Sequence, residues 1–242
     1  MSDRAVRAIL LDIEGTTTPV EFVYDVLFPF ASAQAEQFLR ERWDDQSVQS
    51  DIAGLRAERE GDADKGLDPP EIRGDPQSLG AYVRWLISLD RKATPLKSLQ
   101  GKIWRAGYES GQLHGRIYDD VPRALERWRK QGRKAGIFSS GSVLAQRLLF
   151  SHTTAGDLTP LLSYYFDTNV GPKVNADSYK GIAAEIDDSP SDILFVSDVV
   201  AELDAAQQAG LNTLLCVRPG RKIESGGHES IETFDPIFPD VS

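Results

Sequence analysis

The sequence predicts an α/β protein whose parallel sheet is interrupted, after its first strand, by a block made only of helices. From about residue 116 onward, short apolar runs alternate with helical patterns. These runs lack the polar alternation of half-exposed strands, which favours a parallel sheet covered on both faces. Between about 20 and 115, apolar residues recur only at helical intervals. We therefore expect a core of residues 1–19 and 116–242, with an all-helical insert at 20–115.

The core should contain strands at Val6–Leu11, Ala135–Ser139, Tyr164–Phe166, Ile193–Val196 and Asn212–Val217. Helices are expected at residues 121–130, 142–149, 178–186 and 199–209. In the last of these, Gly210 marks the end, as glycine commonly does. The tail from Arg218 has no clear pattern.

The insert should begin with a helix over residues 21–43, kinked or split at Pro29. A second helix is predicted at 48–60, followed by an exposed loop rich in Gly, Asp and Pro that ends at Ser78, a good N-cap. Two further helices carry apolar faces from Leu79 to Ile87 and from Leu96 to Trp104. Leaving from the end of the first strand, this insert would lie over that end as a lid.

Composition excludes several classes of protein. With 242 residues and 40% hydrophobic content, the chain can bury a sizeable core. Its net charge of −10 argues against nucleic acid and membrane as partners, because both attract basic surfaces. No apolar stretch reaches membrane-spanning length, and the single cysteine, Cys216, lies in an apolar run and fits a reducing compartment. We expect a cytoplasmic protein that acts as a monomer.

Chemistry-bearing residues follow the predicted strands. Asp12 and Glu14 come directly after the first strand, and they would share one face if the extended geometry continued. Two carboxylates so close favour a bound cation or a raised pKa. The next strand ends at Ser139 and Ser140, and a later one at Asp198. Because ligands bind beyond the carboxyl ends of parallel strands, these side chains should converge there.

This set suits phosphoryl transfer. Asp12 would be the nucleophile, since an aspartyl-phosphate divides one hard step into two easier ones. Oxygen ligands from Asp12 and Asp198 favour Mg2+ over zinc. Glu14 could protonate the leaving oxygen and later activate water. The donors expected to bind the phosphoryl oxygens are Ser139, Ser140 and Lys173.

Each residue also has a structural interpretation. The serine pair or Asp198 could cap a helix, and Lys173 could be a solvated surface residue. Glu202, one turn after Asp198, could support a metal, although a solvated helix face is the commoner role. The three histidines show no metal-ligand spacing.

Four motifs in order resemble those of the haloacid dehalogenase superfamily: Asp12-Ile13-Glu14-Gly15-Thr16, Ile137-Phe138-Ser139, Lys173 and Val196-Ser197-Asp198. A narrower resemblance is to the acireductone synthase family, the enolase-phosphatases of methionine salvage. It rests on Asp12–Pro19, Phe138–Ser142, Leu99-Gln100-Gly101 with Trp104, Phe166-Asp167-Thr168 and Val217-Arg218-Pro219-Gly220. Glu14 supports this family, because most of the superfamily has aspartate there.

The resemblance implies a Rossmann-like parallel sheet core with an inserted helical cap, and one Mg2+ per subunit held by Asp12, Asp198 and the backbone carbonyl of Glu14. Ser139, Ser140 and Lys173 would bind substrate. The implied reaction hydrolyses 2,3-diketo-5-methylthiopentyl-1-phosphate and enolises it to the acireductone, 1,2-dihydroxy-3-keto-5-methylthiopentene. Glu14 is a candidate for removing the proton in the enolisation.

Three alternatives stay open from the sequence. The chain could be another small-molecule phosphatase of the same superfamily. It could be a serine hydrolase using Ser140 and His152, although Phe138 stands where the G-x-S-x-G pattern needs its first glycine. It could instead be a non-enzymatic phospho-receiver module in which Asp12 is phosphorylated as a signal.

Overall fold

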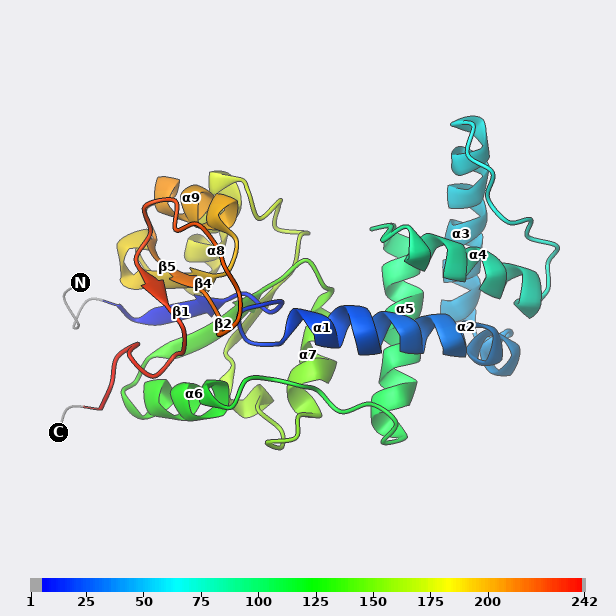
Figure 1. Cartoon of the computed structure of the whole chain (residues 1–242). Coiled ribbons are helices and arrows are strands. Elements are labelled where there is room, and N and C mark those ends of the chain that lie inside the picture. The colour runs from blue at the N-terminus through cyan, green and yellow to red at the C-terminus, as the bar shows by residue number, and fades with distance from the viewer. Residues whose placement is uncertain (1–5, 241–242) are drawn as a thin grey trace. The chain divides into compact units, whose positions relative to one another are not determined.

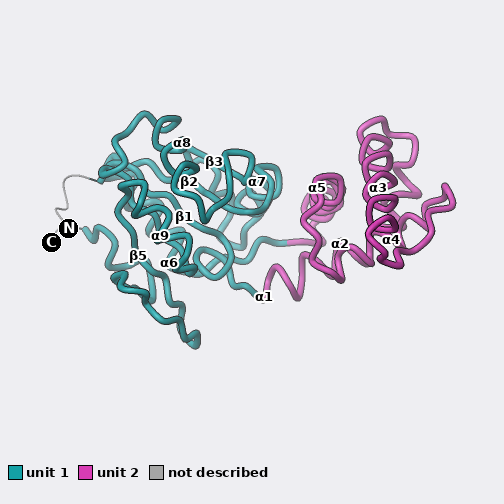
Figure 2. The backbone as a smooth tube through the Cα atoms, turned by 90° about the horizontal axis from the view of Figure 1, so that it is seen from above, with its two compact units in different colours: residues 1–20, 114–242 teal, residues 21–113 magenta. Residues whose placement is uncertain are grey.

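The chain divides into two compact units (Figure 2). The computed structural model describes residues 6–240. One unit spans residues 1–20 and 114–242 and is α/β, and the other spans residues 21–113 and is all helical. Within the described residues, none of the helices combines the length and apolar character that crossing a membrane requires.

The α/β unit is built on a parallel sheet with strand order β3-β2-β1-β4-β5-β6. The strands are β1 (Ala8–Leu11), β2 (Lys134–Phe138), β3 (Tyr164–Phe166), β4 (Ile193–Ser197), β5 (Asn212–Cys216) and β6 (Ser230–Ile231). From β1 the chain adds β2 and β3 on one side, and then β4 to β6 on the other. The strand order therefore reverses between β1 and β4, the place where such sheets bind ligands.

Helices cover both faces of this sheet. They are α6 (Asp120–Lys130), α7 (Val143–Ser151), α8 (Ala176–Ile186) and α9 (Val200–Gln208). Helices α8 and α9 lie over one face and α6 over the other (Figure 1). On the α8–α9 face, Leu10, Phe138 and Phe195 of the strands share one buried cluster with Tyr179 and Leu203 of the helices. The predicted α/β class and parallel sheet are confirmed.

Strand β6 is the part of the sheet that the sequence pattern missed. Its two residues extend the edge next to β5, where Leu215 N donates to Glu229 O at 2.9 Å and Val217 N to Ile231 O at 2.8 Å. A pairing this short and half exposed requires no apolar run, so periodicity does not reveal it.

The helical unit consists of α1 (Val20–Phe22), a π-helical segment η1 (Val23–Leu27), α2 (Phe28–Arg42), α3 (Gln46–Asp64), α4 (Pro76–Ser88) and α5 (Thr94–Glu109). Helix α2 packs on α4, and α3 packs on α5. The irregularity expected at Pro29 is a π segment that ends just before it rather than a break. There Trp104 Nε1 donates to Leu27 O at 2.8 Å, fixing α5 to the end of that segment.

Two predictions about the loop before α4 were wrong. Helix α3 continues to Asp64 instead of ending at residue 60, because Asp62 is buried and accepts from Tyr82 Oη at 2.9 Å and from Arg91 Nη2 at 2.6 Å. The N-cap of α4 is Asp75, not Ser78. Its carboxylate accepts from the backbone of Ser78 at 2.8 Å, and Pro76 takes the first helical position.

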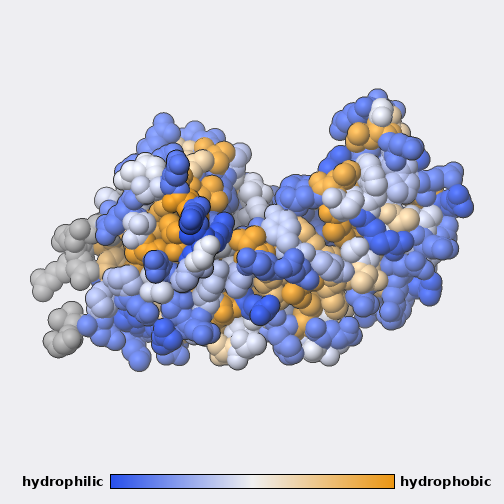
Figure 3. All heavy atoms as spheres, viewed as in Figure 1, coloured by the Kyte–Doolittle hydropathy of each residue, from blue (hydrophilic) through white to orange (hydrophobic). Residues whose placement is uncertain are grey.

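The surface of the described residues is largely hydrophilic on the face seen in Figure 3, with apolar areas interspersed. The large apolar side chains that are exposed are scattered along the chain, at Tyr24, Leu67, Leu89, Val170, Val174 and Val199. Such single exposed residues are normal on a folded protein and indicate no particular partner.

Candidate active site

The site begins where the neighbouring strands β1 and β4 end. Asp12 follows β1 and Asp198 follows β4. The backbone N–H of Asp12 donates to Val196 O at 3.0 Å, which continues the pairing between the strands up to the first carboxylate. Asp12 is 5% exposed and Asp198 7% exposed, so both carboxylates are removed from bulk water. The strand order therefore places two buried acids at adjacent strand ends.

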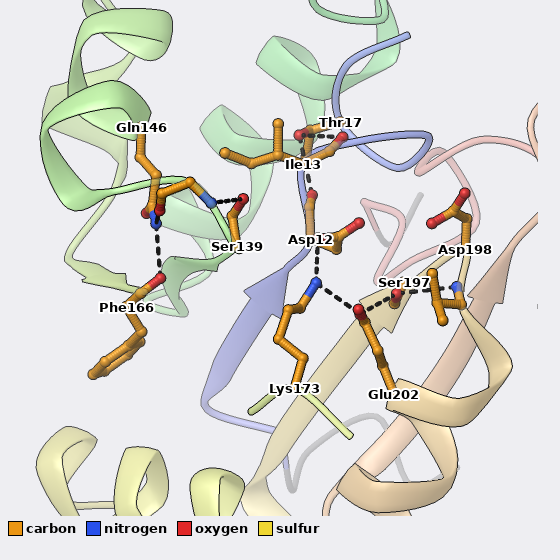
Figure 4. A network of polar contacts seen from close by, with 12 residues as sticks. Asp12, Ile13, Thr17, Ser139, Gln146, Phe166, Lys173, Ser197, Asp198 and Glu202 are labelled. Carbon is orange, nitrogen blue, oxygen red and sulfur yellow. Dashed lines mark hydrogen bonds and ion pairs between the residues drawn. The ribbon is translucent and has the colours of Figure 1, made fainter. Parts of the chain in front are cut away.

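A chain of polar contacts connects Asp12 to the start of α9 (Figure 4). Lys173 Nζ forms an ion pair with Asp12 Oδ1 and lies 2.7 Å from Glu202 Oε2. Ser197 Oγ donates to the same Glu202 oxygen at 2.9 Å and accepts from the backbone N–H of Val199 at 3.1 Å. Lys173 and Asp12 are thus in direct contact although they lie 161 positions apart in the chain.

Lys173 is held by the loop before α8. Its carbonyl accepts from Tyr179 Oη at 2.7 Å, and the neighbouring Pro172 carbonyl accepts from Ser178 Oγ at 2.8 Å. Its ammonium lies 5.7 Å from the ring centre of Phe138 and 6.0 Å from that of Phe195, and the residue is only 9% exposed. The interpretation of Lys173 as a solvated surface residue is therefore wrong.

The loop after β1 is fixed by the hydroxyl of Thr17 within it and by the guanidinium of Arg218, which is far away in the sequence. Thr17 Oγ1 donates to Asp12 O at 3.1 Å and lies 3.3 Å from Ile13 O. The guanidinium of Arg218 donates to Thr16 O from Nε at 2.9 Å and from Nη2 at 2.6 Å. Gly15 has φ of +75°, a conformation that favours glycine. These contacts therefore fix the backbone of the loop directly after Asp12.

Glu14 lies beyond the end of strand β1. Because β1 ends at Leu11, strand alternation does not by itself place Asp12 and Glu14 on the same face. Glu14 is half-buried, whereas Asp12 is buried, and its backbone forms a bridge with that of Thr18 within the tight loop. The chain bends at Ile13, shortly after the strand, and the turn begins at Gly15.

Ser139 and Ser140 follow β2 at the next strand end. Ser139 is buried, its N–H donates to Phe166 O at 3.2 Å, and its hydroxyl accepts from Gly141 N at 3.2 Å. Ser140 is half-buried. The cap of α7 is Ser142, which accepts from Ala145 N at 3.3 Å, so neither serine of the pair is the helix cap. Figure 4 shows Ser139 on the side of Asp12 away from Asp198.

Asp198 is paired with a residue that the sequence analysis did not single out. Arg221 Nη1 donates to Asp198 Oδ2 at 2.6 Å. Asp198 does not cap α9, whose N-cap is Val199 without a side-chain bond. Nothing in the sequence pattern near Arg221 marked it, because it lies in the irregular tail.

Glu202 was expected on a solvated helix face, and that expectation was wrong. It is 9% exposed and faces Lys173 and Ser197 from the first turn of α9. The signal was its spacing: four residues after Asp198, it lies one helical turn from the strand end. Arg218 was also missed as a residue that shapes the site.

The electrostatics of the site show an excess of buried negative charge. Burial raises the pKa of the Asp198 carboxyl above its ordinary value, the Asp12 charge adds to this, and Arg221 opposes it only in part. Burial also raises the pKa of Glu202, against the lowering influence of Lys173. Burial alone would lower the pKa of Lys173, but the Asp12 and Glu202 carboxylates raise it above its ordinary value.

These oxygens fit a Mg2+ ion. Mg2+ needs only one or two protein carboxylates, because it keeps several waters. Asp12 and Asp198 supply that number, and a divalent cation would offset the repulsion between their charges, which Arg221 offsets only in part. Across residues 6–240, no three His, Cys, Asp or Glu side chains gather as a metal-binding group.

The serine-hydrolase alternative has little support in the geometry. His152 is the C-cap of α7, and its Nδ1 lies 2.7 Å from Ser151 Oγ and 3.1 Å from Leu148 O. These contacts belong to the helix end.

Comparison with known proteins identifies the family to which the chain belongs. A family model described as haloacid dehalogenase-like hydrolase matches residues 6–210. The chain is 49% identical to Enolase-phosphatase E1 of Synechococcus elongatus over 96% of this chain and 98% of the relative. It is 43% identical to Enolase-phosphatase E1 of Drosophila melanogaster over 98% of this chain and 94% of that protein.

A solved structure agrees with these relatives. The UTR4 protein of Saccharomyces cerevisiae superposes with a TM-score of 0.77 at 33% identity, covering 96% of this chain and 99% of that one. Such relatives are enzymes, so the phospho-receiver alternative is wrong. The chain belongs to the haloacid dehalogenase-like hydrolases and, within them, to the enolase-phosphatase E1 family.

Proposed function

We propose that this phosphatase is a Mg2+-dependent enolase-phosphatase of methionine salvage that converts 2,3-diketo-5-methylthiopentyl-1-phosphate to the acireductone and phosphate. The observation that carries the proposal is the buried contact of Asp12 with Lys173, beside Asp198, at the switch point of the sheet. The names of the relatives support an enolase-phosphatase reaction. The proposal includes a monomeric cytoplasmic enzyme whose residues 20–115 act as the cap.

Asp12 is the nucleophile in this proposal. One of its carboxylate oxygens attacks phosphorus, the bond from phosphorus to the substrate oxygen breaks, and an aspartyl-phosphate forms. Lys173 contacts Asp12 Oδ1, so its ammonium lies where it can offset the charge of the incoming phosphoryl group. The contact also orients the carboxylate, because the lysine is fixed by Glu202.

Asp12, Asp198 and the backbone carbonyl of Glu14 would hold the Mg2+ ion. When bound, this ion supplies positive charge that screens the carboxylates from the anionic phosphate. Ser139 and Ser140 bind the phosphoryl oxygens from the neighbouring strand end.

Glu14 carries the proton transfers. It donates a proton to the leaving oxygen of the substrate and then accepts one from the water that attacks the aspartyl-phosphate, which releases phosphate and restores Asp12. In the enolisation, Glu14 is also our candidate for removing the proton next to the diketone. Its side chain is one methylene longer than aspartate, which extends its reach toward a second atom.

The decisive experiment compares phosphate release from the diketone phosphate by wild type, Asp12→Asn and the control Asp119→Asn. Asp119 is exposed and lies at the start of α6. We expect Asp12→Asn to lose turnover with its fold intact, because the amide is close in shape but is not a nucleophile. Retained turnover would exclude the mechanism. A panel of other small phosphates identifies the substrate, since only the enolase-phosphatase reaction gives a product with enediol absorbance.

A second variant tests Glu14. If the longer side chain serves enolisation, Glu14→Asp should slow formation of the enediol more than it slows phosphate release. Equal slowing of both steps would assign the enolisation to another residue.

A further inference from the structure

Arg221 lies at the place where Asp198 meets the loop after β1. Its Nη1 is 2.6 Å from Asp198 Oδ2. A Cβ placed on Gly15 would lie 2.1 Å from Arg221 Nη1 and 2.2 Å from Asp198 Oδ2. The guanidinium, the carboxylate and the backbone of the loop therefore meet at one point, and only a glycine leaves room for them.

The segment that carries Arg221 is fastened at both ends. We call residues 219–227 the Arg221 strap. Before it, Arg218 is 2% exposed and is bonded to Asp120 Oδ2 at 2.7 Å. After it, His228 is buried and lies between Thr213 Oγ1 and Asp204 Oδ1, at 3.0 Å from each. The strap thus holds Arg221 at the site, because the residues on both sides of the strap are fixed by their contacts.

The middle of the strap is also in contact with the α/β unit. Ile223 packs against the buried cluster of the sheet, and a Cβ on Gly226 would lie 2.5 Å from Val200 Cγ1. Most other strap residues are exposed. The side chain of Arg221 is 37% exposed, so it reaches water on one side and the buried Asp198 on the other. It can leave Asp198 without unfolding the strap.

We propose that Arg221 is an internal cation that occupies Asp198 in the metal-free protein and competes with the divalent metal for that carboxylate. The inference rests on the part of the proposed function that assigns Asp198 to the metal. The guanidinium occupies Asp198 Oδ2, and its positive charge repels a second cation that approaches the same carboxylate. The ion pair therefore weakens metal binding in the wild type.

The strap has a second consequence. Since the backbone on both sides of Arg221 is fixed, the displaced guanidinium stays close to Asp198, and the ion pair re-forms when the metal leaves. The carboxylate is then never left without a cation, which avoids the cost of an unpaired buried charge.

The test measures Mg2+ binding to metal-free protein by isothermal titration calorimetry, without substrate. The variants are Arg221→Met and the matched control Lys222→Met, which removes the same charge from the next, exposed position of the strap. We expect Arg221→Met to bind Mg2+ about fivefold or more tightly than wild type, at the lower end of typical coupling between two bound groups. Lys222→Met should stay close to wild type.

Thermal unfolding gives an independent readout. Mg2+ should raise the melting temperature of Arg221→Met by more than it raises that of wild type, because the competing positive charge is absent from the variant. The inference is overturned if wild type binds Mg2+ and Arg221→Met binds it no more tightly than Lys222→Met. Failure of wild type to bind Mg2+ would instead overturn the metal assignment of the proposed function, and this inference with it.

Discussion

The ammonium of Lys173 lies 2.7 Å from the carboxylate of Glu202, which places a buried acid from α9 behind the cation that contacts Asp12. Ser197 Oγ donates to the same Glu202 oxygen, so the acid is itself held in place. Glu202 touches neither substrate nor metal in the proposed mechanism. It is a positioning residue that acts through Lys173.

Glu202→Gln should lower kcat about 10- to 100-fold, the usual cost of losing a supporting partner of an active-site group. The Glu202 charge helps to raise the pKa of Lys173, so its removal lowers that pKa. The protonated lysine is then lost at lower pH, and the alkaline limb of the pH–rate profile moves to lower pH. Steady-state kinetics across pH measure this. Glu185→Gln, exposed on α8, is the control, and an unmoved alkaline limb in Glu202→Gln would contradict the role.

Gly15→Ala should reduce turnover about 100-fold, the effect expected when catalytic groups are displaced by about an ångström. The new methyl group would meet Arg221 and Asp198 at distances near 2 Å, so the carboxylate must move. The left-handed φ of +75° adds a stability cost of about 1–2 kcal/mol.

Gly132→Ala separates the two effects. Gly132 has φ of +74°, and nothing lies within 4 Å of its added Cβ. Urea unfolding should show a similar backbone cost in both variants, whereas phosphate release should fall only in Gly15→Ala. Equal activity in the two variants would show that Asp198 tolerates the displacement.

Asp198→Asn should stabilise the metal-free protein while it abolishes activity. The pKa of Asp198 is raised above its ordinary value of 3.8 in the folded protein, so its ionisation costs the folded state more than the unfolded chain. The metal-free wild type therefore loses stability as pH rises from below 3.8 through the raised pKa.

We expect the gain from Asp198→Asn at neutral pH to lie within the ~0.5–2 kcal/mol typical of single stabilising substitutions. It should disappear below the ordinary carboxyl pKa, where Asp198 is protonated in both states. Urea unfolding in the presence of a chelator, at several pH values, measures the difference. If the stability gain of Asp198→Asn is the same at all pH values, the charge of Asp198 is not its cause.

Arg218→Met should destabilise the α/β unit by about 3–5 kcal/mol, the cost of leaving one partner of a buried ion pair alone. Arg218 is 2% exposed and joins Thr16 of the catalytic loop to Asp120 at the start of α6. Its guanidinium also lies 4.1 Å from the ring centre of Tyr118.

A double-mutant cycle with Asp120→Asn isolates the pair. Because the two residues are in contact, the double variant should be less destabilised than the sum of the single variants, by about 0.5–3 kcal/mol. Arg129→Met, exposed on the same helix, should be near neutral. Additive effects of Arg218→Met and Asp120→Asn would mean that the ion pair contributes nothing.

Much of the fold could be predicted from periodicity. The runs at Ala8–Leu11 and Ile193–Ser197 are wholly buried, so every residue is apolar or small and the strands are visible in the sequence. The elements missed or misplaced depend on single long-range bonds. Helix α3 is longer than its pattern because Tyr82 and Arg91 bind Asp62, and β6 exists because β5 offers an unpaired edge.

The sequence by itself determined the parallel α/β core, the helical insert and the residues at the strand ends, because each depends on patterns within one segment. Only the tertiary structure decided how those residues meet: that Lys173 lies between Asp12 and Glu202, that Arg218 holds the loop at Thr16, and that Arg221 reaches Asp198. Ion pairs between residues far apart in the chain leave no periodic trace. They form only when packing of the sheet and helices removes water from between the charges.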